Sequence, residues 1–171
     1  MATRGYGVHS PLAFKLVKNV IRPKRNVVYY GEERLEDLPQ PFSIIRKARI
    51  LLRFVAELQP AYVWASSKTP EILLEAVKMA GGVVRIYDGD VFPDEIDKAD
   101  LIILYQTRLT KKILSRQMKR KVEIAGFDLE PRMIETLTQL FSGGVMLEGE
   151  KSLLIVNRPQ DAPHFYLVNR F

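Results

Sequence analysis

Hydrophobic and polar positions follow two different patterns along the chain. In the first 60 residues apolar side chains recur at helical spacing, which predicts two amphipathic helices, over 11–21 and 42–58. Ser10 is a good N-cap for the first helix, and Pro11 suits its first turn. Beyond residue 60 short apolar runs alternate with helical stretches, so a pattern of strands and helices is predicted there.

The elements expected after residue 60 describe a layered α/β domain. Strands are predicted over 61–66, 83–88, 99–106, 122–127, 145–150, 152–159 and 164–171, and helices over 69–82, 109–121 and 131–144. Thr69 is the expected N-cap of the first of these helices. The run ADLIILYQ is nearly all apolar, as parallel strands covered on both faces are. The last three strands are joined by tight turns, so we expect them to be antiparallel.

Together these elements predict a three-layer, Rossmann-like sandwich with a mainly parallel sheet and antiparallel C-terminal strands. We expect one domain, in which residues 1–60 form a basic helical extension and residues 61–171 form the α/β core. Ligands of such sheets bind at the carboxyl ends of the strands, near the switch in strand order. This rule directs attention to Ala65–Pro70, Asp88–Asp90 and Tyr105–Arg108.

Composition excludes several kinds of chemistry. The 171 residues include no cysteine and two histidines, so disulfides, thiolate nucleophiles and cysteine-based zinc sites are ruled out. No apolar run approaches the roughly 18 to 20 residues that span a bilayer. The N-terminus lacks the pattern of a signal peptide. The expected setting is therefore the cytoplasm, with no membrane partner.

The net charge of +6 is concentrated at one end of the chain. Residues 1–60 carry 11 Lys/Arg against 5 Asp/Glu, whereas residues 61–171 carry 15 of each. A second basic run, 108–121, holds seven basic residues and no acidic one. Such stretches fit either a groove for phosphates and RNA or the solvated faces of basic helices, and the sequence leaves both interpretations open.

Two other groups of polar residues suggest chemistry less directly. Four acidic residues lie within 94–100, but their spacing matches no calcium loop, so we interpret them as a solvated loop and predict no metal site. His9 is the one candidate catalytic residue, because the pKa range of histidine suits a general base. A structural role for His9 beside the first helix is the simpler interpretation.

Three stretches of the chain resemble a known family. They are GVHSPLAFKLVKNVI near the N-terminus, RKARILLRFVAELQPAYV before the first core strand, and SLLIVNRPQDAPHFYLVNRF at the end. Each is similar to a segment of the class I S-adenosylmethionine-dependent methyltransferases found in Bacteroidetes, and the first is the most specific. The resemblance implies a methyltransferase-type sandwich and an ancestry among enzymes that use S-adenosylmethionine.

The sequence departs from this family where the cofactor would bind. In the family the first strand ends in an acidic residue followed by a glycine-rich turn, and both hold the methionine part of the cofactor. Here Trp64 stands in place of the acid, and Ser66 and Pro70 stand in place of glycines. Tryptophan offers no carboxylate, and proline has no N–H to donate. The resemblance therefore implies that ordinary cofactor binding has been lost.

The following strands keep part of the family pattern. Asp88 ends the second strand, where the family carries the acid that binds ribose hydroxyls, although aspartate is also a common turn residue there. Tyr105 stands where related enzymes present an aspartate. Nine residues separate Asp90 from Asp100, whereas the family has a helix, a strand and another helix in that interval. These elements are expected to be missing.

Three hypotheses for function remain. The leading one is a diverged relative without normal cofactor binding, which serves as a binding or partner subunit for another protein or for a second copy. In the second, an active methyltransferase has a non-standard pocket in which Asp88 holds the ribose, and Ser66 and Ser67 replace the turn. Trp64 or Tyr105 would then stack on the adenine. The third is a basic module that binds nucleic acid.

Overall fold

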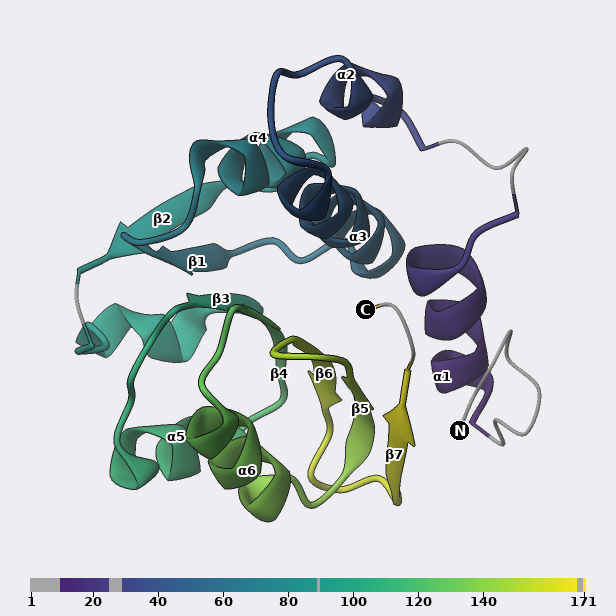
Figure 1. Ribbon diagram of the computed structural model, residues 1–171. Coiled ribbons are helices and arrows are strands. Elements are labelled where there is room, and N and C mark those ends of the chain that lie inside the picture. Colours follow the sequence, from purple (N-terminus) through teal and green to yellow (C-terminus); the bar gives the residue numbers. More distant parts are fainter. Residues whose placement is uncertain (1–9, 25–28, 89, 169–170) are drawn as a thin grey trace.

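A seven-stranded mixed sheet with the order β2-β1-β3-β4-β6-β5-β7 lies at the centre of the protein (Figure 1). The computed structural model describes residues 10–24, 29–88, 90–168 and 171. The strands are β1 Val63–Ser66, β2 Val84–Tyr87, β3 Leu101–Tyr105, β4 Val122–Phe127, β5 Gly144–Glu148, β6 Leu153–Asn157 and β7 Pro163–Leu167. All seven predicted strands of the core are therefore present.

The strand directions confirm a mainly parallel arrangement at one end of the sheet and correct one prediction at the other. Strands β2, β1, β3 and β4 are parallel, and β6 is antiparallel to both β4 and β5. The last strand, β7, was expected to be antiparallel to its neighbour but is parallel to β5. Both edges of β6 are already paired, so the returning chain adds to the free edge of β5, the nearest one.

Helices cover both faces of the sheet (Figure 1). Their bounds are α1 Pro11–Leu16, η1 Val17–Ile21, α2 Glu32–Glu36, α3 Phe42–Leu58, α4 Glu71–Met79, η2 Asp94–Lys98, α5 Lys111–Met118 and α6 Pro131–Leu140. Helices α3 and α4 pack on one face, where their side chains share a buried cluster with Ala65 and Ile103. Helices α5 and α6 pack on the opposite face, in a cluster that includes Trp64 and Ile102.

The N-terminal helices pack directly on this core. Leu16 and Val20 belong to the same buried cluster as Leu51 of α3 and Leu147 of β5. The Ser10 hydroxyl caps α1 by accepting a hydrogen bond from the Ala13 amide at 3.3 Å, as the sequence predicts. The predicted helix continues to residue 21, but its last five residues, η1, have π-helical geometry. Helix α3 has the predicted bounds.

Two local predictions differ from the structure. Thr69 does not cap α4, because the helix begins at Glu71 after Pro70 and has no side-chain cap. The hydroxyl oxygen of Thr69 is buried and has no hydrogen-bond partner. The acidic stretch is not an open loop throughout, since Asp94–Lys98 form the 3-10 helix η2. Pro70 has an extended backbone, with φ −57° and ψ 144°, and takes the N-cap position, so α4 begins one residue later than a Thr69 cap would place it.

Within the described part of the chain, no helix is long and apolar enough to cross a membrane.

A partly buried carboxyl group lies at the amino-terminal edge of the parallel strands. Glu123, near the start of β4, is hydrogen-bonded through its backbone amide to the Asp100 carbonyl oxygen, 2.7 Å away. Burial, together with the Asp100 carboxylate, raises the pKa of the Glu123 carboxyl to about 7. A carboxyl group with a raised pKa binds more protons in the folded protein than in the unfolded chain. Stability therefore falls as the pH rises from the ordinary value of 4.5 toward about 7.

Replacing Glu123 with glutamine should remove this loss of stability. We expect Glu123→Gln to be more stable than the native protein by about 1–2 kcal/mol at pH 8, with little difference at pH 4. Urea unfolding at the two pH values measures the change. Glu135→Gln, an exposed position on α6, is the matched control and should change neither value. A Glu123→Gln effect of equal size at both pH values would contradict the interpretation.

Candidate functional site

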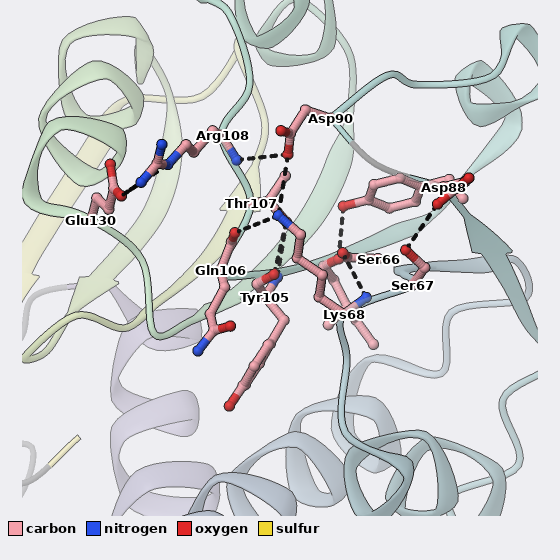
Figure 2. Close-up of polar contacts among 12 residues, drawn as sticks. Ser66, Ser67, Lys68, Asp88, Asp90, Tyr105, Gln106, Thr107, Arg108 and Glu130 are labelled. Carbon is pink, nitrogen blue, oxygen red and sulfur yellow. Dashed lines mark hydrogen bonds and ion pairs between the residues drawn. The ribbon is translucent and has the colours of Figure 1, made fainter.

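The strand order reverses between β1 and β3. The chain passes from β1 outward to β2 and then crosses to the other side of β1, where it forms β3. In open α/β sheets ligands bind in the crevice outside the carboxyl ends of the strands at such a point. The polar residues of the three segments named from the sequence meet there (Figure 2).

The backbone amides of the turn after β1 are already hydrogen-bonded within the chain. The Ser67 amide donates to the Tyr87 carbonyl oxygen at 2.9 Å. The Lys68 amide donates to the Ser66 hydroxyl at 3.2 Å, and the Thr69 amide donates to the Ser66 carbonyl oxygen at 2.9 Å. The next residue is a proline, which has no N–H. None of these four positions offers a free amide to a ligand.

The side chain of Lys68 reaches from the end of β1 toward the end of β3 (Figure 2). Its ammonium group donates to the Gln106 carbonyl oxygen at 3.3 Å and lies 3.8 Å from the Asp90 carboxylate. The same carboxylate accepts a hydrogen bond from the Arg108 amide at 3.1 Å. These contacts therefore connect the ends of all three strands. We call the group that forms them the crevice bridge; it consists of Lys68, Asp90, Gln106 and Arg108.

Asp88 and Ser67 also lie together at the crevice. The Ser67 hydroxyl donates to the Asp88 carboxylate at 3.3 Å, and both side chains are exposed. Ser66 differs from them because it is buried, with 1% of its surface exposed. Its hydroxyl belongs to the interior of the turn, whereas Ser67 and Asp88 face solvent.

The two aromatic residues considered for stacking lie on opposite faces of the sheet. Trp64 is buried in the cluster under α5 and α6, together with Ile102. Tyr105 belongs to the cluster under α3 and α4, together with Ala65. Each residue is only 8% exposed. Trp64 and Tyr105 therefore cannot line one pocket, and both act as core side chains.

Tyr105 takes part in a hydrogen-bonded group that the sequence pattern does not reveal. Its hydroxyl donates to the Asp128 carboxylate at 2.8 Å, and the Lys47 ammonium group binds the same carboxylate. Burial and the hydrogen bond to Asp128 raise the pKa of Tyr105 to about 12. Burial alone would raise the pKa of the Asp128 carboxyl, but Lys47 and Tyr105 outweigh it and hold that pKa below its usual range.

One signal in the sequence could have identified Asp128. It is the first polar residue after the buried strand β4, which is the same signal that selected Asp88 after β2. Asp128 and Gln106 both have positive φ angles, 50° and 48°, and each directly follows a parallel strand. Left-handed backbone at residues other than glycine carries a conformational cost and is enriched at functional sites.

A cavity of about 310 Å³ lies beside Lys47, between α3 and the turn that joins β5 to β6. Its lining combines three phenylalanines with three basic and two acidic residues. The lining residues are Phe42, Ser43, Arg46, Lys47, Ile50, Phe127, Asp128, Glu150, Lys151, Ser152 and Phe171. The volume falls at the lower end of the range for small-molecule sites.

Several basic residues of 108–121 are paired with acidic residues. Arg108 forms an ion pair with Glu130 at 2.6 Å. Arg116 pairs with Asp97, and Arg120 lies 3.8 Å from the same carboxylate. This pairing lowers the charge available to a nucleic acid. The Arg116 guanidinium hydrogen-bonded to Asp97 holds the pKa of that carboxyl below its usual range.

The remaining candidates give no further site. His9 lies outside the described residues. Among the residues that are described, no group of three or more histidines and acidic residues is arranged to hold a metal ion. No protein-family model and no curated protein matches the sequence.

Proposed function

We propose that this chain is a methyltransferase-like α/β protein whose cofactor crevice has been rebuilt, and that it serves as a binding or partner subunit. The resemblance of its two ends to the methyltransferases supports the ancestry. The single observation that supports the loss of cofactor binding is the turn after β1, whose backbone amides are already hydrogen-bonded within the chain. Its amides donate to Ser66 and to the Tyr87 carbonyl oxygen, so none of them is free to bind a ligand.

The charges at the ends of these strands also argue against binding of the cofactor. S-adenosylmethionine carries a positive sulfonium, a positive amino group and a negative carboxylate, and its amino group needs an acidic partner at the end of β1. Trp64 provides none, because it is an indole buried in the core. Lys68 adds a third cation, although Asp90 lies 3.8 Å from it. A ligand at this position would have to displace the crevice bridge and leave its polar groups unpaired.

Calorimetric titration of the native protein with S-adenosylmethionine and with its demethylated product tests the proposal. We expect no binding of either compound, meaning a dissociation constant weaker than about 1 mM. Lys68→Met is the matched variant, since it removes the ammonium group but keeps every backbone hydrogen bond of the turn. We expect no binding by this variant either. A micromolar dissociation constant for the native protein would overturn the proposal.

One observation favours the second candidate, an active enzyme with an unusual pocket. Asp88 remains exposed at the end of β2, with Ser67 donating to it at 3.3 Å. A carboxylate in that place can accept hydrogen bonds from ribose hydroxyls. If the titration shows binding, Asp88→Ala must abolish it, whereas Asp37→Ala, an exposed acid beyond α2, must not. Unchanged affinity in Asp88→Ala would remove this candidate.

A further inference from the structure

Strand β2 forms one edge of the sheet, and its outer side is open. Among the described residues no strand pairs with that side. The carbonyl oxygens of Val83 and Tyr87 accept hydrogen bonds from the β1 side, from the amides of Val63 and Ser67. Because successive residues of a strand point their backbone groups to alternate sides, the N–H and C=O groups of residues 84 and 86 point outward.

Apolar side chains accompany these outward-pointing groups. Ile86 is 48% exposed and Val83 is 68% exposed. Tyr62, just before β1, and Val91, just after β2, are 55% and 70% exposed. An open edge with exposed apolar residues is a template for pairing with another chain, and natural proteins usually cover or charge it.

The segment after β2 explains why the edge is uncovered. Residues 91–100 are too few for another strand with its connecting helices, and they form the short helix η2 instead. This segment packs on a face of the sheet, since the Phe92 ring contacts the Tyr87 ring edge-on with centroids 5.0 Å apart. Ile96 of η2 is buried in the same cluster as Tyr87. The segment therefore covers a face of β2 and leaves its edge free.

We propose that a second copy of this chain pairs with β2 across a two-fold axis, joining two seven-stranded sheets into one. An antiparallel pair exchanges two hydrogen bonds between residues whose backbone groups point toward each other. If the axis passes between the two copies of Ile86, these two residues lie opposite each other. Val84 of each copy then lies opposite Asp88 of the other. This register satisfies the outward groups on both strands and buries the two isoleucines against each other.

Charge complementarity favours this antiparallel pairing of identical strands. Arg85 is exposed and points to the same face of the sheet as Tyr87, the face on which η2 packs. In the proposed register Arg85 lies opposite Tyr87 of the other copy and so beside that copy's η2. The first turn of η2 carries the exposed acids Asp94 and Glu95.

The oligomeric state in solution tests the proposal. Sedimentation velocity over about 10 µM to about 1 mM should show a concentration-dependent dimer, as expected for a small interface. Ile86→Lys places two ammonium groups opposite each other at the axis, so we expect a monomer. Leu167→Lys is the matched control: it lies on β7 at the other edge of the sheet and is 52% exposed. This variant should dimerise like the native protein.

Circular dichroism checks that both lysine variants fold, and a second variant covers the case in which Ile86→Lys does not. The substitution Arg85→Glu places a third negative charge near Asp94 and Glu95 of the other copy. It should raise the dissociation constant of the dimer at least about tenfold at low salt. A native protein that stays monomeric at about 1 mM overturns the proposal. The proposal is also overturned if Leu167→Lys dissociates the dimer and Ile86→Lys does not. The cofactor titration has no bearing on either outcome, so the two proposals fail separately.

Discussion

Replacing Arg53 with methionine should destabilise the protein by about 3–5 kcal/mol. Arg53 lies in α3 and is 5% exposed, and its guanidinium group forms an ion pair with Glu32 of α2, which is 2% exposed. It also donates to the Val20 carbonyl oxygen at 3.2 Å, at the end of the first helix. Arg53 thus attaches both N-terminal helical segments to the core.

The expected loss comes from the carboxylate that Arg53→Met leaves behind. Burial alone would raise the pKa of the Glu32 carboxyl, but the hydrogen bonds from Arg53 and Arg49 outweigh it and lower that pKa. Without Arg53 the buried charge keeps the Tyr29 amide, at 3.3 Å, and Arg49, which reaches Glu32 at 2.8 Å from a more exposed position. Methionine preserves much of the apolar volume, so packing alone accounts for little of the effect.

Urea unfolding at pH 7 measures this prediction with two comparison variants. Arg49→Met should cost about 1 kcal/mol or less, because its side chain is 31% exposed and the buried Arg53–Glu32 pair survives. The double variant Arg53→Met with Glu32→Leu removes both buried charges and should return to within about 1 kcal/mol of the native protein. Equal losses from Arg53→Met and the double variant would show that the buried charge is not the cause.

Replacing Gly144 with alanine should cost more than about 4 kcal/mol and leave little of the native state. Gly144 begins β5, between β6 and β7, and pairs with Asn157 and Pro163. A Cβ atom there would lie 2.1 Å from the Val156 carbonyl oxygen and 2.7 Å from the Arg158 nitrogen. Both are backbone atoms, one in β6 and one directly after it. The clash can therefore be relieved only if β5 and β6 move apart.

Gly81→Ala separates this clash from the backbone effect of the substitution. Gly81 has a φ angle of 90° and Gly144 one of 97°, so both positions disfavour alanine for the same conformational reason. A Cβ at Gly81 would meet nothing within 4 Å. We expect Gly81→Ala to cost about 1–2 kcal/mol, the penalty of left-handed backbone alone. Denaturant midpoints compare the two, and equal midpoints would contradict the steric argument.

Elements with a strong periodic pattern and clear end signals were predicted well. Helix α3 has its predicted bounds, because apolar positions repeat at helical spacing and Pro60 follows its end. Strand β4 also has its predicted bounds. Burial enforces both patterns locally, so neighbouring residues are enough to define them.

The meeting of the three candidate segments was predicted, but the contacts between them were not. The rule for strand ends selected the turn after β1, Asp88 and the end of β3, and the structure brings these segments together. It could not show that the Lys68 ammonium group would reach the Gln106 carbonyl oxygen, 38 residues away in sequence. The Lys47–Asp128 pair joins residues 81 positions apart and was missed for the same reason.

The sequence by itself determined the alternation of strands and helices, the Ser10 cap of the first helix, the bounds of α3 and β4, and which residues are apolar enough to be buried. Only the tertiary structure decided that β7 runs parallel to β5, that Trp64 and Tyr105 lie on opposite faces, and that no strand of the described residues pairs with the outer edge of β2. The physical reason is the range of the forces involved. Periodicity and capping act within one or two turns of chain, whereas strand order depends on which sheet edges are still free when distant segments meet.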